Sequence, residues 1–146
     1  VLTSAEGDGI LVAYNYSPEL DTPANKAFLQ RWAAMNKGST EAINELAVLQ
    51  YQGAKLWAEG VKRAGSMDRA KVIAAMAAGT SIDGPSGKVT IDPATHHVTL
   101  DMHVMEISGQ KLKVLQSFPQ RPPRETQVVC DLRKTPNASV QHEIKL

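Results

Sequence analysis

The stretch "ILVAYNYSPELDTPANKAFLQRW", residues 10–32, joins an apolar run to a capped helix and decides how the first part of the chain folds. Its first four residues are continuously apolar, which is typical of a strand covered on both faces in a parallel sheet. Tyr14, Asn15 and Tyr16 come next. Three amphipathic side chains here indicate either an ordinary strand end that reaches the surface, or a crossover between two lobes that presents two rings and an amide to a cleft.

A helix is predicted directly after this run, from about residue 23 to Lys37-Gly38. Asp21 or Thr22 can accept hydrogen bonds from free backbone N–H groups of the first turn, and Pro23 suits the first helical position. Apolar residues spaced four and three apart form its predicted buried stripe. They are Phe28, Trp32 and Met35.

Two further helices are predicted after it. One is capped by Ser39 or Thr40 and runs to Gly65, and the next is capped by Ser66 and ends near Gly79. The predicted inward residues of the longer helix are Ile43, Ala47, Gln50, Ala54, Trp57 and Val61. Those of the shorter helix are Val72, Ile73, Met76 and Ala77.

Beyond Gly79 the hydrophobic period changes from that of a helix to that of a strand. A turn cluster at 83–87 and a short strand precede an alternating run that predicts a strand with one buried face, with 111–116 as its hairpin partner. The residues expected to face inward are Val98, Leu100, Met102 and Val104, and those expected to face outward are Thr99, Asp101, His103 and Met105. Residues 126–132 predict a last strand before a polar tail.

The composition limits the classes of partner and compartment. The 146 residues are 42% hydrophobic and 21% charged with a net charge of +1, so we expect one ordinary globular chain that does not bind nucleic acid. No apolar run approaches the roughly 20 residues of a membrane span, and the first nine residues lack the pattern of a signal peptide. The single Cys130 forms no internal disulfide and slightly favours a reducing compartment.

Catalytic, metal and cofactor sites are not expected. The chain has no G-x-S-x-G, phosphate-binding loop, H-E-x-x-H or C-x-x-C motif, so we expect no enzyme and no cofactor. His96 and His97 are adjacent in a turn and point apart, while Asp101 and His103 share the predicted solvent face of a strand. We therefore expect no metal site.

The predicted elements do not make a complete fold. A helix that is apolar on several sides must be packed from more than one direction, and a parallel strand needs neighbouring strands. We expect the chain to oligomerise or to be one part of a larger fold, and not to exist alone as a compact monomer.

Three segments, in this order and at these separations, resemble a known family: "NYSPELDTPANKAFLQRW", "YQGAKLWAEGVKRAGSMD" and "IDGPSGKVTIDPATHHV". They resemble the carboxy-terminal part of the type I periplasmic-binding-protein fold, in its urea and short-chain amide branch. That branch includes solute-binding proteins of ABC importers and the cytoplasmic amide sensor of amidase operons. The resemblance implies an α/β fold, incomplete by itself, with three helices, a parallel strand and a β-hairpin region of a two-lobed protein.

The resemblance also implies how the chain is divided. Residues 1–16 would be a crossover strand and 17–80 the helical part of the amino-terminal lobe. Residues 81–131 would be a β-rich part of the other lobe, followed by a polar tail at 132–146. The ligand would lie in the interlobe cleft, and Tyr14, Asn15, Tyr16 and Tyr51 are the expected ligand-binding residues. The alternative for each is strand-end or core packing.

The implied function is that of a periplasmic substrate-binding protein for urea, a short-chain amide or a similar small polar solute. Its partners would be the solute, an ABC transporter permease, and either the amino-terminal half of the fold or a second copy of the chain. A cytoplasmic amide-sensing regulator and an assembly protein without a ligand are the alternatives.

Overall fold

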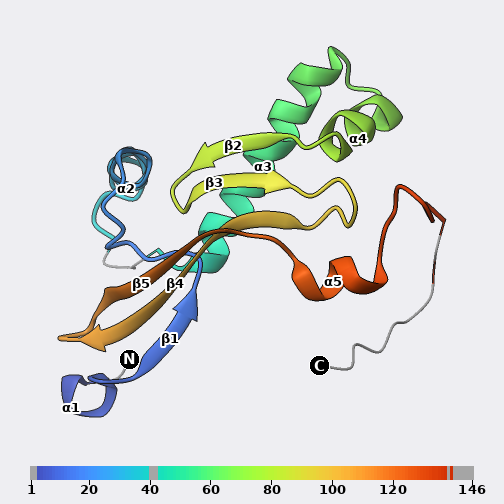
Figure 1. The fold of residues 1–146 in the computed structure, drawn as a ribbon. Coiled ribbons are helices and arrows are strands. Elements are labelled where there is room, and N and C mark those ends of the chain that lie inside the picture. The colour runs from blue at the N-terminus through green and yellow to red at the C-terminus, as the bar shows by residue number, and fades with distance from the viewer. Residues whose placement is uncertain (1–2, 40–42, 138, 140–146) are drawn as a thin grey trace.

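The protein is described by a computed structural model that places residues 3–39, 43–137 and 139. It combines helices with a five-stranded sheet, which confirms the predicted α/β class (Figure 1). The helices are α1 (Ser4–Gly7), α2 (Pro23–Met35), α3 (Glu45–Ala64), α4 (Arg69–Ala77) and α5 (Arg124–Val129). The strands are β1 (Leu11–Tyr14), β2 (Ser81–Gly84), β3 (Gly87–Ile91), β4 (Val98–Ser108) and β5 (Lys111–Arg121).

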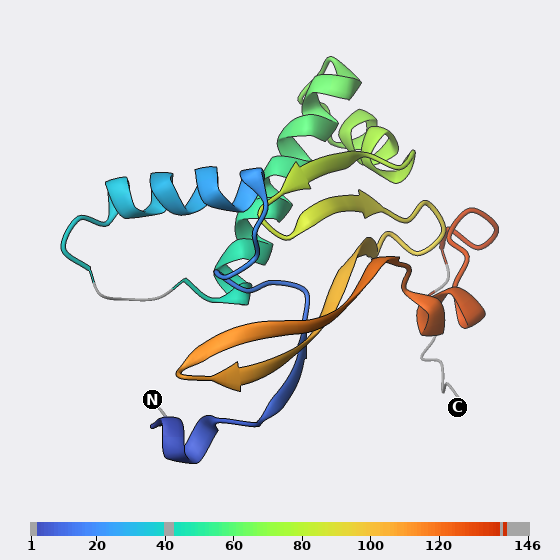
Figure 2. The same ribbon diagram turned by 60° about the vertical axis from the view of Figure 1, so that its left-hand side comes forward.

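The long strand β4 organises the sheet. Its first residues pair with β3, its last residues pair with β1, and β5 runs along its other side, with every pairing antiparallel. The β4–β5 hairpin extends away from the helices and carries β1 and α1 with it (Figure 2). The prediction of a parallel first strand is therefore wrong.

The strand β1 is also not covered on both faces, and Leu11 is 62% exposed. A continuous apolar run gives no information about which strand will pair with it, or in which direction. Here the partner, β4, lies some 90 residues further along the chain, with Leu11 opposite Glu106. β1 is therefore an edge strand of the extended hairpin, rather than the centre of a parallel sheet.

The helix α2 begins as predicted. The Thr22 hydroxyl oxygen accepts a hydrogen bond from the Asn25 N–H at 3.1 Å, and Pro23 occupies the first helical position. Phe28 is buried, whereas Met35 at the last turn is exposed, so the predicted stripe is right only over its first part.

The helix α3 exists as predicted, but its predicted buried stripe is wrong. The buried side is Val48, Gln52, Leu56 and Gly60, four residues apart, and Trp57 is 49% exposed. Because the sequence is apolar on several sides of this helix, its period does not select one of them. The tertiary contacts select the side with Gly60, where an added Cβ would lie 2.5 Å from Cγ of Met76 in α4.

The caps of α3 and α4 also differ from the predicted ones. Asn44 caps α3, accepting from the Ala47 N–H at 3.0 Å, rather than Ser39; Thr40 lies outside the described residues. Asp68 caps α4. Ser66, the predicted cap, lies two residues before it, and its hydroxyl oxygen accepts a hydrogen bond from the Asp68 N–H. Ser, Asn and Asp cap helices about equally well, so the difference is one of position: Asn44 and Asp68 stand directly before their helices. Ile73 of α4, expected inward, is exposed.

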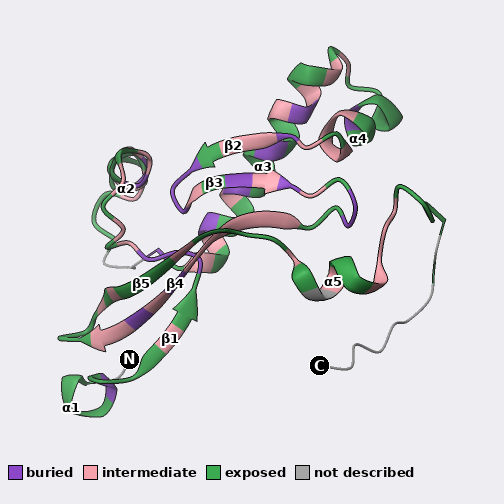
Figure 3. Ribbon diagram, in the orientation of Figure 1, coloured by how far each residue is buried: buried purple, intermediate pink, exposed green. Residues whose placement is uncertain are grey.

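Two clusters of buried apolar side chains hold the helices and strands together, and α3 takes part in both (Figure 3). Val48 belongs to the first cluster, with Tyr16, Phe28 and Ile43. Leu56, two turns later, belongs to the second cluster, with Val89 and Ile91 of β3. The helix therefore links the segment after β1 to the β2–β3 hairpin.

The strand β4 changes which of its faces is covered. Val98 and Leu100 pack against the second cluster as predicted, but further along His103 and Met105 are buried, which contradicts the prediction that they face solvent. The β4–β5 register shifts twice in this region, and each shift places one extra residue on β5. Such bulges increase the local twist, and the far end of β4 turns its other face inward.

The predicted last strand is wrong as well. Its first half forms the short helix α5, in which the Gln127 N–H donates to the Pro123 carbonyl at 3.0 Å and the Cys130 N–H donates to Thr126 at 2.9 Å. A short apolar run is ambiguous between helix and strand, and among the described residues no strand pairs with it.

Candidate ligand-binding site

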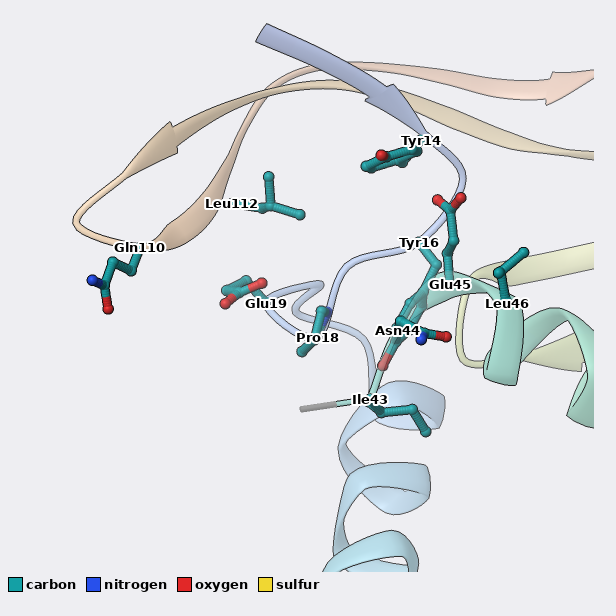
Figure 4. A pocket seen from close by; sticks show the side chains of 10 residues that line it. All are labelled: Tyr14, Tyr16, Pro18, Glu19, Ile43, Asn44, Glu45, Leu46, Gln110 and Leu112. Atoms are coloured by element: carbon teal, nitrogen blue, oxygen red, sulfur yellow. The ribbon is translucent and has the colours of Figure 1, made fainter. Parts of the chain in front are cut away.

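A cavity of about 420 Å³ lies between the β1 and β5 strands on one side and the start of α3 on the other (Figure 4). Three separate parts of the chain form it: the end of β1 with the loop after it, the first turn of α3, and the tip of the β4–β5 hairpin. The residues that line it are Tyr14, Tyr16, Pro18, Glu19, Ile43, Asn44, Glu45, Leu46, Gln110 and Leu112.

Tyr14 brings a ring and a free hydroxyl to this cavity. It is the last residue of β1, is 40% exposed, and its ring lies over the cavity with Leu112 of β5 beside it (Figure 4). No described group forms a hydrogen bond with its hydroxyl. Tyr14 therefore fits the expected role of a ligand-contacting residue, although the role itself stays a prediction.

Tyr16 lines the same cavity but its hydroxyl is already used. The side chain is 2% exposed, and the hydroxyl donates to Oδ1 of Asn25 at 3.0 Å. The Asn25 amide in turn donates to the carbonyls of Pro18 and Leu20 at 3.0 and 2.9 Å. Burial, aided by the nearby Glu19 carboxylate, raises the pKa of Tyr16 to about 12. Tyr16 therefore shapes the cavity wall and stays neutral.

Asn15 points elsewhere, because successive side chains of an extended segment alternate between opposite sides. It is buried, does not line the cavity, and its Nδ2 has no hydrogen-bond partner among the described residues. Of the three consecutive residues expected to border the cleft, the structure thus brings two together.

Tyr51 lies apart from these residues. Its ring packs on Phe28 at 4.9 Å between centroids, and its hydroxyl accepts a hydrogen bond from Arg31 at 3.1 Å. It borders a different hollow of about 280 Å³ between α2 and α3. Its contacts are those of the core alternative, and a role in ligand binding stays a prediction.

The cavity is lined by two carboxylates that the sequence reasoning missed, Glu19 and Glu45. Glu45 stands in the first turn of α3, and its Oε2 is buried without a hydrogen-bond partner in the described part of the chain. Glu19 is held by the hydroxyl of Ser17. None of the ten lining residues is Lys, Arg or His (Figure 4). A group with N–H or O–H donors fits this cavity better than an anion does.

The sequence carried only a partial signal for these residues. Asn followed by an acidic residue is a common pattern at the start of a helix. Had this pattern been used to place the start of α3 at Asn44, it would also have located Glu45. Leu112 and Gln110 come from a hairpin about 100 residues beyond Tyr14, and no local pattern joins them to it.

Among the described residues, no three His, Cys, Asp or Glu side chains lie close enough together to hold a metal ion. His103 is 8% exposed, and its Nδ1 lies 2.8 Å from the Ser117 hydroxyl. Burial lowers the pKa of His103, against a smaller raising effect of Asp101. Among the helices that the structure describes, none has the length and apolar character needed to cross a membrane.

Comparison with known proteins gives consistent matches. A family model described as periplasmic binding protein matches residues 1–111. The structure is similar to that of a solute-binding protein of an ABC transporter from Rhodopseudomonas palustris HaA2 in complex with p-hydroxybenzoic acid. The two are 33% identical with a TM-score of 0.69, over 80% of this chain and 32% of that one. A search of curated protein sequences gives no match.

Two other solved structures extend the comparison. A solute-binding protein of an ABC transporter from R. palustris in complex with benzoate is 29% identical, with a TM-score of 0.67 over 78% of this chain and 31% of that one. A Brucella ovis protein that binds leucine, isoleucine, valine, threonine and alanine is 19% identical, with a TM-score of 0.64 over 80% and 33%, and shows the shared fold alone. The chain spans about a third of the length of these structures.

Proposed function

Because this chain belongs to the periplasmic binding protein family, we propose that it is part of a solute-binding protein of an ABC importer. The cavity at the end of β1 is its share of the ligand cleft. One observation carries this proposal: Tyr14 of β1 and Glu45 of α3 line the same cavity. The Tyr14 hydroxyl and Oε2 of Glu45 have no hydrogen-bond partner among the described residues.

We propose further that this part of the cleft holds the donor-bearing end of a small solute. Two carboxylates without a neighbouring cation favour the N–H groups of urea or an amide, the ammonium group of an amino acid, or a phenolic O–H. Two of the similar structures contain p-hydroxybenzoic acid or benzoate, and the third is named for binding amino acids; none of the three is named for urea or an amide. A carboxylate end of the solute would therefore contact residues outside this cavity.

The proposed setting is that of an importer. The partners would be the small solute, a permease, and either the remainder of the two-lobed fold or a second copy of the chain. An extracytoplasmic place, as in the periplasm, follows from that role. A cytoplasmic amide sensor and a ligand-free assembly protein find no support in the similar structures, which are named as transporter proteins.

The test measures ligand affinity by calorimetry in the native protein that carries this sequence, with urea, acetamide, leucine and p-hydroxybenzoate as ligands. Tyr14→Phe and Glu45→Gln each remove one cavity group and should weaken the best ligand about five- to hundred-fold, equivalent to about 1 to 3 kcal/mol. Glu59→Gln, which changes the same residue type as Glu45→Gln on α3 away from the cavity, is the matched control. Affinities of Tyr14→Phe and Glu45→Gln equal to that of Glu59→Gln would refute the site.

A further inference from the structure

A second hollow, of about 460 Å³, lies on the opposite face of the β1–β4–β5 sheet from the cleft cavity. It is bordered by the middle of β4, the end of β5 and the start of α5, whose arrangement can be followed in Figure 1. The bordering residues are Ala13, Met102, His103, Val104, Phe118, Arg121, Pro122 and Arg124.

The strand register shows that the two hollows are on different faces. Ala13 lies opposite Val104, and Met102 lies opposite Phe118, so these four side chains share one face of the sheet. Tyr14, next to Ala13, points to the other face. His103 pairs with Tyr14, so its ring is on the same face as Tyr14, where its Nδ1 lies 2.8 Å from the Ser117 hydroxyl.

The floor of this hollow is apolar, and its rim carries two like charges. Met102, Val104 and Phe118, which form the floor, are half-buried. Arg121 and Arg124 are exposed, and none of the ion pairs among the described side chains includes either of them. No Asp or Glu is among the bordering residues.

Two guanidinium groups beside one apolar surface suit a particular ligand chemistry. A guanidinium binds a carboxylate through two parallel N–H···O bonds, and the same carboxylate reduces the repulsion between two neighbouring arginines. An apolar body attached to that carboxylate would cover the side chains of Met102, Val104 and Phe118.

We propose that this hollow is a second binding site, separate from the cleft, for a small carboxylate that carries an apolar body. Arg121 and Arg124 bind the carboxylate, and Met102, Val104 and Phe118 bind the body. The cleft cavity has the reverse character, with two carboxylates and no cation, so the two sites select different ligands. The proposal does not depend on the function proposed for the cleft.

The test is a titration of the native protein that carries this sequence with phenylacetate, followed by the backbone amide signals of these residues in NMR spectra. We expect saturable shifts at Ala13, Val104 and Phe118, and no matching shifts at Tyr16 or Glu45. Shifts that centre on the cleft residues, or that do not saturate, would overturn the proposal.

Variants assign the charge requirement. The double variant R121Q/R124Q should weaken phenylacetate at least tenfold. The double variant K111Q/K113Q removes the same net charge from positions of β5 outside the hollow, and it should weaken phenylacetate less than twofold. Equal losses in the two double variants would mean that phenylacetate responds only to the overall charge of the protein, and would refute a built site. Thermal unfolding of each variant checks that it is folded.

Two further ligands test separately whether the site needs the carboxylate and whether it needs the apolar body. Phenylacetamide has the same shape without the charge, and it should bind at least tenfold more weakly than phenylacetate. Sulfate has charge without an apolar body, and it should not displace phenylacetate at equal concentration. If phenylacetamide binds as tightly as phenylacetate, the arginines do not select a carboxylate, and the proposal is wrong. If sulfate displaces phenylacetate efficiently, the apolar floor does not contribute to binding, and the proposal is wrong as well.

Discussion

Two buried asparagines ten residues apart illustrate how differently the two regions around the cleft are built. Asn25, at the start of α2, uses its whole side-chain amide: Oδ1 accepts from Tyr16, and Nδ2 donates to Pro18 and Leu20. Asn15, directly after β1, is also buried, at 8% exposure, yet its Nδ2 has no hydrogen-bond partner among the described residues.

The same contrast extends along α3 and β4. The described buried side-chain atoms without partners belong to Asn15, Glu45, Gln52 and His103. Three of these residues lie directly after β1, at the start of α3 or on the strand paired with β1, and of these Glu45 lines the cavity. Unpaired buried polar atoms are costly, and this region is less completely hydrogen-bonded than the loop before α2. The loop before α2, by contrast, is a finished structural unit.

The largest expected effect tests the finished region. Asn25→Ala removes one acceptor and two donated hydrogen bonds at a fully buried position, and leaves the Tyr16 hydroxyl and two carbonyls unpaired. We expect a loss of about 3 kcal/mol in the free energy of unfolding, measured with urea. A loss below about 1 kcal/mol would show that the loop is not held by this side chain.

The next effect tests which face of β4 is covered near the cleft. Met105 is completely buried, whereas Leu100, at the start of the strand, is only half-buried. We expect Met105→Ala to cost about 2 to 3 kcal/mol of unfolding free energy, and Leu100→Ala about 1 to 2. If Leu100→Ala costs more, the face expected from the simple alternation is the true one.

A smaller effect concerns pH. Burial holds the pKa of His103 below its ordinary value of 6.5, so the unfolded chain takes up a proton at a higher pH than the folded chain does. Stability is then complete above about pH 6.5 and falls as the pH is lowered through the folded pKa. Between pH 7 and pH 5 we expect the free energy of unfolding to fall, and His103→Gln should reduce this fall. Identical pH profiles for the wild-type protein and His103→Gln, measured by urea unfolding, would argue against it.

The smallest effect completes the comparison of the two asparagines. Asn15→Ala removes an amide whose Nδ2 makes no described hydrogen bond, so we expect a change of less than about 0.5 kcal/mol in unfolding free energy. A loss close to that of Asn25→Ala would show that Asn15 is as fully used as Asn25.

Much of the local structure could be read from the sequence. The start of α2 was predicted from Thr22 and Pro23, because capping depends on residues adjacent in the chain. The long helix to Gly65 and the β4–β5 hairpin were predicted from period and turn residues. Tyr14, Asn15, Tyr16 and Tyr51 were expected to bind a ligand; Tyr14 and Tyr16 line the cavity, Asn15 and Tyr51 do not, and ligand binding by any of the four stays a prediction.

The faces and partners could not be read in the same way. The inward side of α3 depends on Gly60 meeting Met76, and the covered face of β4 depends on bulges in the other strand. Glu45 and Leu112 join Tyr14 only because the chain returns twice to the end of β1. Each of these is a contact between distant segments, which a local pattern does not specify.

By itself, the sequence determined the class of the fold, the position of most helices and strands, and a family resemblance that the family match supports. Helix capping, hydrophobic periodicity and turn preferences each depend on residues a few positions apart, so a local stretch of sequence is enough to predict them. Only the tertiary structure decided the antiparallel pairing of β1, the acidic character of the cleft cavity, and the arginine-rimmed hollow behind it. Pleat and register assign neighbouring residues such as Ala13 and Tyr14 to opposite faces, and what covers each face comes from residues about 30 to 110 positions away.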